Sequence, residues 1–250
     1  MGLKEQGSWD VWEFGLQRGC EHGMGFDGRR EKDGRVWEAR TNSEEHTAGR
    51  TEEEKKIKMA TPGKCFLFTG PPGIGKTTLV MKVLESLKIS IPSLKVRGFY
   101  TREVRHGTER VGFEVVTLDG RRGPLASTTY SSAESLRWPS VGKYKVDTAS
   151  FESLAMPELQ VKEDTELFII DEVGKMELYS ASFFPAVLKV LESNIPILAT
   201  IPIPKFGHDI PGVARLRNHP GAAIFTLNTE NRDSIKEEIC TKLVNLLQKQ

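Results

Sequence analysis

A glycine-rich segment, Gly70-Pro71-Pro72-Gly73-Ile74-Gly75-Lys76-Thr77, gives the chain its strongest chemical signal. The segment fits the pattern GxxxxGK[ST]; it follows an apolar run, 64–69, and precedes residues with helical spacing. Glycines let the backbone bend tightly and approach phosphate groups, and successive N–H groups then form a nest for anions. We expect Lys76 to contact the β- and γ-phosphates of a nucleotide and the Thr77 hydroxyl to bind Mg2+.

Two carboxylates at the end of an apolar run give a second signal. Residues 167–170 are all apolar and are followed by Asp171 and Glu172. A buried parallel strand delivers its last residues to the rim where a phosphate loop also lies. Asp171 is expected to hold Mg2+ directly or through a water molecule. Glu172, expected on the opposite side of the strand, would activate a water for attack on the γ-phosphate, which makes Glu172 and Lys76 the candidate catalytic residues.

The carboxylate pair alone also fits the start of a solvated loop, and only the phosphate loop upstream favours catalysis. The roles of other charged residues are also left undecided by the sequence. Lys175 is either a cation near the triphosphate or a surface lysine, and Glu177 is either a partner of the site or an acid at a helix start. For three arginines we favour a surface position over a role above the phosphates: Arg102, Arg105 and Arg110.

Alternating strands and helices are expected to position these groups. The apolar runs predict strands at 64–69, 96–100, 167–170, 197–201 and 222–227. Helical spacing predicts helices at 79–87, 151–159, 183–191 and 235–247. Alternation on both sides of His106-Gly107 predicts a β-hairpin, and the Pro, Ser and Thr content of 121–145 suggests a loop. The sequence therefore predicts an α/β fold, a mostly parallel sheet with helices on both faces and a hairpin as its antiparallel departure.

Composition narrows the class of protein. The formal net charge of +1 over 250 residues gives no indication of a nucleic-acid or anionic-membrane partner. No run of eighteen apolar residues occurs, so no transmembrane helix is expected. The three cysteines (Cys20, Cys65 and Cys240) are expected to be free thiols in a reducing compartment, the cytoplasm.

A change in composition near Met59 predicts a boundary. Residues 1–58 are rich in glycine and charge, lack sustained periodicity, and carry neither a signal-peptide core nor the acid-poor character of a transit peptide. Such a segment buries too little apolar surface to offset its ordering entropy, so we expect it to be disordered. The functional unit is expected to be 59–250, a single P-loop NTPase domain.

Together these residues resemble the THEP1-type family of nucleoside-triphosphatases. The resemblance runs from about Lys64 to the C-terminus and leaves out residues 1–58. Its most distinctive blocks are Gly98-Phe99-Tyr100-Thr101 and Asp171-Glu172-Val173-Gly174-Lys175-Met176-Glu177. Further matching segments are 68–78, 103–105, 110–116, 141–144, 200–202 and 231–232.

The resemblance implies a RecA-like P-loop domain that acts as a monomer and hydrolyses a nucleoside triphosphate to the diphosphate and phosphate. It also implies dependence on Mg2+ and activity on several nucleotides, ATP and GTP among them. The metal-binding residues would be Thr77 and Asp171. The nucleotide-binding residues would be Gly70, Pro71, Pro72, Gly73, Ile74, Gly75, Lys76, Thr77 and Thr78 of the loop, with Asp171, Glu172, Val173 and Gly174 of the strand end.

Three other functions share the same phosphate loop. A nucleotide or small-metabolite kinase needs a water-excluding lid, and no lid is recognisable in the sequence. A AAA+-like remodelling subunit needs a helical lid domain, for which too little chain follows Ile201. A nucleotide-sensing switch would bind tightly with little turnover. Hydrolysis is the main prediction, because a glutamate beside the metal-side aspartate suits the activation of water.

Overall fold

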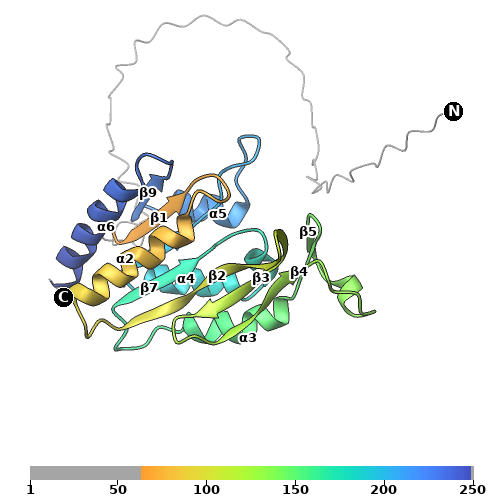
Figure 1. Cartoon of the computed structure of the whole chain (residues 1–250). Coiled ribbons are helices and arrows are strands. Elements are labelled where there is room, and N and C mark those ends of the chain that lie inside the picture. The colour runs from red at the N-terminus through yellow and green to blue at the C-terminus, as the bar shows by residue number, and fades with distance from the viewer. Residues whose placement is uncertain (1–62, 249–250) are drawn as a thin grey trace, which may run out of the picture. The chain divides into compact units, whose positions relative to one another are not determined.

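The structure is a computed structural model that describes residues 63–248, so the disorder expected for 1–58 lies outside the described residues. Within the described range the chain forms one nine-stranded β-sheet with helices on both faces (Figure 1). The strands are β1 (Cys65–Thr69), β2 (Val96–His106), β3 (Glu109–Thr117), β4 (Arg122–Ser127), β5 (Ser140–Val141), β6 (Tyr144–Val146), β7 (Leu167–Asp171), β8 (Ile197–Thr200) and β9 (Ala222–Thr226). The α-helices are α2 (Lys76–Ser90), α3 (Thr148–Glu158), α4 (Phe183–Glu192), α5 (Pro211–Arg217) and α6 (Arg232–Leu247), and η1 (Ser135–Arg137) and η2 (Glu177–Tyr179) are short 3-10 helices.

The sheet has a parallel part and an antiparallel part. Its strand order is β5-β6-β4-β3-β2-β7-β8-β1-β9. The strands β2, β7, β8, β1 and β9 are parallel, and β3, β4, β6 and β5 continue the sheet with antiparallel pairing. The predicted α/β class, the parallel strands and the hairpin are therefore confirmed, and the antiparallel part is larger than a hairpin alone.

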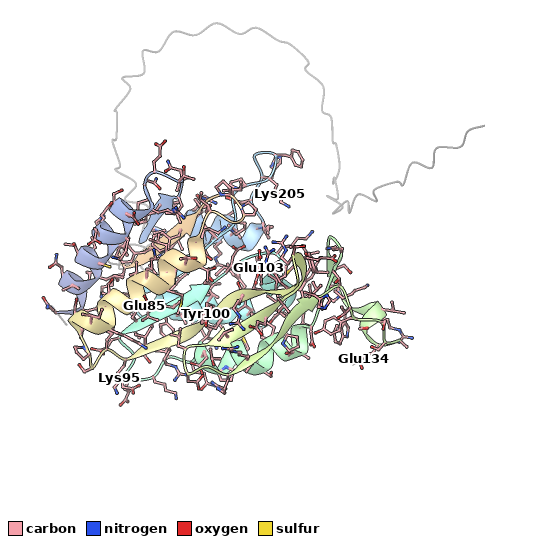
Figure 2. The ribbon with its side chains drawn as sticks, in the orientation of Figure 1. Glu85, Lys95, Tyr100, Glu103, Glu134 and Lys205 are labelled. Atoms are coloured by element: carbon pink, nitrogen blue, oxygen red, sulfur yellow. The ribbon has the colours of Figure 1, made fainter. Side chains whose placement is uncertain are left out.

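The long strand β2 joins the two parts. It combines the predicted strand 96–100 with the first arm of the predicted hairpin. Its parallel pairing with β7 ends at the pair Tyr100–Asp171, while its pairing with β3 continues to His106–Glu109. The hairpin of β2 and β3 thus extends past the end of β7, and Figure 2 shows Glu103 on this extension beyond Tyr100.

The loop predicted for 121–145 is wrong, because this stretch contains β4, β5 and the start of β6. Pro124 is a poor strand residue, but it lies beside a register shift between Phe113 and Glu114 of β3, where a missing N–H is tolerated. Leu125 and Ala126 are buried in the core. Strands this short, with a proline and a glycine, give no periodic signal.

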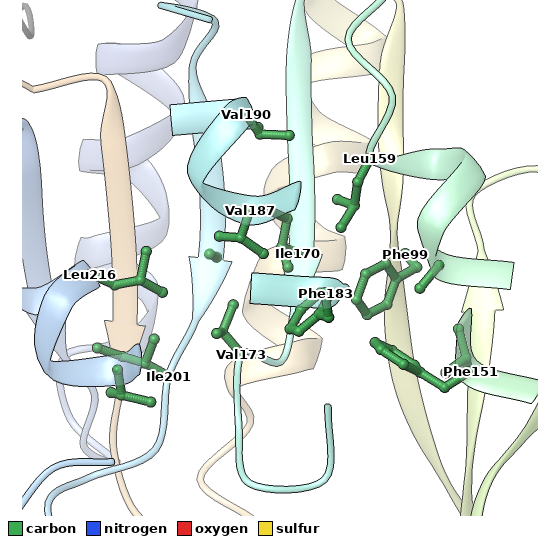
Figure 3. Close-up of a cluster of buried hydrophobic side chains, with 14 of the residues drawn as sticks. Phe99, Phe151, Leu159, Ile170, Val173, Phe183, Val187, Val190, Ile201 and Leu216 are labelled. Atoms are coloured by element: carbon green, nitrogen blue, oxygen red, sulfur yellow. The ribbon is translucent and has the colours of Figure 1, made fainter. Parts of the chain in front are cut away.

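Helices cover both faces of the sheet, as predicted. Helices α2 and α6 pack on one face with Phe66 and Phe68 of β1. Helices α3, α4 and α5 pack on the other face, where Phe99, Phe151 and Phe183 meet edge to face or tilted (Figure 3). Burial on both faces explains why β1, β7 and β8 have continuous apolar sequences.

This architecture brings the predicted chemical groups to one edge of the sheet. The carboxyl ends of β1, β7, β8 and β9 lie together because these strands are parallel neighbours. The segment Gly70–Gly75 leaves β1 at this edge and leads directly into α2. Among the described residues, no helix is both long and apolar enough to span a membrane.

Candidate nucleotide-binding and catalytic site

The phosphate loop has the strand–loop–helix context that its chemistry requires. Gly75 precedes α2 with a φ of 97°, a left-handed conformation that favours glycine. No side chain of residues 63–248 caps the N-terminus of this helix, so within this range its first N–H groups are available to an anion. Pro71, Pro72, Gly73 and Thr78 are exposed, as residues that contact a ligand from solvent need to be.

Lys76 and Glu172, the two candidate catalytic residues, lie together. The Lys76 ammonium donates to the carbonyl of Gly70 at 3.2 Å and lies 3.8 Å from Glu172 Oε2. Strand alternation placed Glu172 on the opposite side from Asp171, but β7 ends at Asp171 and alternation does not extend beyond it. Burial raises the pKa of the Glu172 carboxyl, and the charge of Lys76 opposes that rise. A raised pKa suits a group that accepts a proton from water.

Asp171 is the centre of a buried hydrogen-bond network. Its carboxylate accepts from the Thr77 hydroxyl at 2.7 Å and from the Thr200 hydroxyl at 2.5 Å. The residue is 1% exposed, and this burial raises the pKa of the carboxyl while both hydroxyls act against the rise. The structure therefore joins the two predicted metal-side residues, which are 94 positions apart in the sequence.

Thr200 is a site residue that the sequence interpretation did not assign. It is fully buried at the end of β8, the strand between those of the phosphate loop and of Asp171. Its signal in the sequence was its place, as the polar residue next to the end of the predicted strand 197–201. Polar residues at such strand ends belong to the rim where ligands bind in open α/β sheets.

The oxygen atoms of Thr77 and Asp171 fit Mg2+. They are hard donors, and Mg2+ is commonly held by one or two protein oxygens together with substrate phosphates rather than by a cage of protein ligands. No cluster of three or more His, Cys, Asp or Glu side chains suited to a metal occurs among residues 63–248.

The segment after Glu172 is held by its own hydrogen bonds. The N–H of Val173 donates to the carbonyl of Thr200 at 2.9 Å, and the N–H of Gly174 donates to Glu177 Oε2 at 3.1 Å. Val173 and Gly174, two of the predicted nucleotide-binding residues, therefore use their N–H groups in hydrogen bonds within the chain. Glu177 is 4% exposed; burial and the nearby Glu172 raise its pKa to about 8. The buried Glu177 therefore stabilises the segment after Glu172 through its hydrogen bond with Gly174, whereas the Lys175 side chain is exposed.

The hairpin arginines are paired with carboxylates of the same hairpin. Arg102 is paired with Glu114 in a salt bridge, while Arg105 and Arg110 lie 2.6 and 2.7 Å from Glu103. These pairs neutralise the arginines locally and fit the surface position that the sequence favoured.

The fold and this site define a P-loop nucleoside-triphosphatase: a parallel α/β core with the phosphate loop after its first strand and the Asp171-Glu172 pair at the end of β7, with β8 between the two strands. A family model described as NTPase matches residues 65–240. The chain therefore belongs to the family of THEP1 and cancer-related nucleoside-triphosphatases, and the predicted resemblance is confirmed.

Relatives from animals and bacteria match the same part of the chain. The cancer-related nucleoside-triphosphatase homolog of Bos taurus is 45% identical over 184 residues, which are 70% of this chain and 94% of that protein. Nucleoside-triphosphatase THEP1 of Thermotoga maritima is 39% identical over 179 residues, 71% of this chain and 94% of that protein.

Two solved structures share the fold. The crystal structure of THEP1 from Aquifex aeolicus has 38% identity and a TM-score of 0.61, and the match covers 72% of this chain and 98% of that one. The solution structure of a human cancer-related nucleoside triphosphatase has 42% identity and a TM-score of 0.62, with coverage of 72% and 97%.

Proposed function

We propose that the protein is a Mg2+-dependent hydrolase that converts several nucleoside triphosphates to the diphosphate and phosphate. One observation carries the proposal: the Glu172 carboxylate lies beside the phosphate-loop lysine while its neighbour Asp171 is bonded to Thr77. In this proposal, the base for water and the metal site lie together at the carboxyl end of β7.

The chemistry assigns a task to each group. Glu172 orients a water molecule and accepts its proton as the water oxygen attacks the γ-phosphorus. The bond from that phosphorus to the β–γ bridging oxygen breaks, and the Lys76 ammonium offsets negative charge on the phosphate oxygens. Thr77 and Asp171 would hold Mg2+, which supplies further neutralisation of that charge. We also propose a monomer as the working unit, as the family resemblance implies.

The proposed broad nucleotide specificity rests on the parts of the nucleotide that the phosphate loop recognises. The phosphate loop and its lysine recognise charge and shape, which all nucleoside triphosphates share. The names of the relatives, which are nucleoside-triphosphatases without a stated base, support the same proposal.

Phosphate release in the absence of any acceptor tests this function. The purified full chain is incubated with ATP and Mg2+, with ATP and a chelator, and beside Lys76→Ala. We expect release that requires Mg2+ and is lost in the variant together with ATP binding. Release that appears only after an acceptor is added would identify a kinase instead, and tight binding without release would identify a switch.

A further inference from the structure

The segment that joins β9 to α6 flanks the phosphate loop and has no task in the chemistry above. It touches the loop at two points. A Cβ on Gly70 would lie 2.9 Å from the carbonyl oxygen of Leu227. At the other end of the loop, Arg232 Nη1 donates to the carbonyl of Ile74 at 3.4 Å, and a Cβ on Gly75 would lie 3.3 Å from the same nitrogen. The Arg232 guanidinium therefore lies against the loop just before α2.

The order of the strands fixes which end of a nucleotide lies here. In the sequence β7-β8-β1-β9, the phosphate loop belongs to β1. Asp171 and Thr200 end β7 and β8, and Glu172 follows directly after β7, so the γ-phosphate end of the nucleotide points to that side. The nucleoside end must leave the loop on the other side, toward β9 and the segment that carries Arg232.

Arg232 is free to bind a ligand, and its backbone is held in place. The side chain is exposed, and no carboxylate within residues 63–248 forms a salt bridge with it, in contrast to the hairpin arginines. The turn before it is locked, because Asn228 Oδ1 accepts from the N–H groups of Glu230 and Asn231. Asn231 in turn donates to the carbonyl of Thr226 at 2.9 Å.

We propose that the Arg232 guanidinium stacks on the nucleobase of the bound nucleotide and forms the base subsite together with the 227–231 segment. The proposal rests on the nucleotide site described under Proposed function. A guanidinium is planar and stacks on aromatic faces. Every nucleobase has such a face, so stacking accepts purines and pyrimidines without reading their edges. The subsite thus adds affinity for the nucleoside without selecting one base.

Binding of two ligands that differ by the nucleoside tests this subsite. The affinities of Mg–ADP and of Mg–pyrophosphate are measured by calorimetry on the full chain and on Arg232→Ala and Arg232→Lys. Stacking predicts that both variants bind ADP about five- to fiftyfold more weakly. It predicts that pyrophosphate binding in both variants stays within about twofold of the wild type, because pyrophosphate has no base that could stack on Arg232. Lysine keeps the charge but not the planar group, so it restores little.

Two results would overturn the proposal. An equal loss of affinity for both ligands would mean that Arg232 contacts phosphate or merely holds the loop in place, and ADP binding unchanged in both variants would exclude the contact. Arg122→Ala is the matched control, because Arg122 is exposed on β4, away from β1 in the strand order, and forms no salt bridge with a carboxylate of residues 63–248.

Steady-state kinetics provides an independent readout. Stacking predicts that Arg232→Ala raises KM for ATP and GTP more than for CTP and UTP, because purines offer a larger face, with kcat preserved. A lowered kcat with equal KM for all four nucleotides would contradict it. If the hydrolase proposal were wrong but the subsite proposal correct, the wild type would release no phosphate, yet its ADP binding would still depend on Arg232.

Discussion

Among single residues, Asp171 links the most parts of the site. Its two carboxylate oxygens accept from Thr77 at the start of α2 and from Thr200 at the end of β8. Neighbouring Glu172 approaches Lys76. A shift of Asp171 would therefore displace the metal-side oxygens and the proposed base together, so its hydrogen bonds matter for both.

We predict that Thr200→Val weakens the response to Mg2+. Valine keeps the shape of threonine but leaves Asp171 without the 2.5 Å hydrogen bond that orients it. Loss of an oriented partner of a metal ligand typically costs about 10- to 100-fold in metal affinity or activity. A titration of phosphate release against Mg2+ measures the effect. Thr165→Val is the matched control, because the buried Thr165 hydroxyl has no hydrogen-bond partner within the described residues, and its loss should leave the Mg2+ response unchanged.

A second prediction concerns the dependence of stability on pH. Burial raises the pKa of Glu177 to about 8, so the folded chain keeps a proton that the unfolded chain releases near the ordinary value of 4.5. Between these values the folded state binds more protons, and its free energy of unfolding falls as pH rises. At about 1.4 kcal/mol per pKa unit, the loss amounts to several kcal/mol.

Thermal unfolding of metal-free protein across this pH range checks the sign. Glu177→Gln is the test variant, because glutamine is neutral throughout and should show a shallower fall in the unfolding midpoint. Equal slopes for the two proteins would mean that Glu177 does not titrate in this range.

At the level of secondary structure, the sequence correctly predicted the helices and strands whose apolar residues follow a clear pattern. The apolar runs of β1, β7 and β8 predicted strands, and both faces of these strands are buried. The run of β9 also predicted a strand, although this edge strand is only partly buried. The helical spacing of α2, α4 and α6 likewise predicted helices. The phosphate loop and Asp171-Glu172 were recognised from residue type and place. These are features that depend on local sequence alone.

What the sequence missed depends on tertiary contacts. The β4 strand contains Gly123 and Pro124, and only its register shift against β3 explains why a proline fits there. The contact between Lys76 and Glu172, and the bond from Thr200 to Asp171, join residues far apart in the chain. Arg232 was noticed only as part of a family block, since its position against the loop exists only after β9 pairs with β1.

Close packing of β2 against β7 gives a prediction at this level. Gly98 has a φ of 124°, and a Cβ there would lie 1.8 Å from the carbonyl oxygen of Ile169. Gly98→Ala must therefore push β2 away from β7, the strand that ends at Asp171. We expect a loss of about 3 kcal/mol or more in the free energy of unfolding, measured by denaturant titration. Gly107→Ala is the control: Gly107 has a φ of 59° and open space around it, so about 1 kcal/mol is expected. Similar losses in both variants would argue against the strand clash.

For the whole molecule, the part of the chain that matches the relatives covers nearly their full length. The matches cover 94% of the Bos taurus and Thermotoga maritima proteins but only 70% and 71% of this chain. The family model begins at residue 65, close to the boundary that composition indicates near Met59. Both observations favour 59–250 as the functional unit.

We therefore predict that a chain beginning at Met59 folds and hydrolyses ATP as the full chain does. The catalytic groups and the core described above all lie within 63–248. Circular dichroism, thermal unfolding and phosphate release compare the two proteins. A truncated chain that fails to fold, or that loses nucleotide binding, would show that the first 58 residues belong to the functional unit.

The most direct test of the whole account is phosphate release by Glu172→Gln with Mg2+ and each of ATP, GTP, CTP and UTP, measured beside ATP binding. Glutamine keeps the size of the side chain but cannot accept the proton of the attacking water. We predict release from all four nucleotides by the wild type, a loss of about 10²–10⁴-fold in kcat in the variant, and unchanged ATP binding. Turnover by the variant at the wild-type rate would contradict the role of Glu172, and ATP binding by the wild type without release would contradict the hydrolase itself.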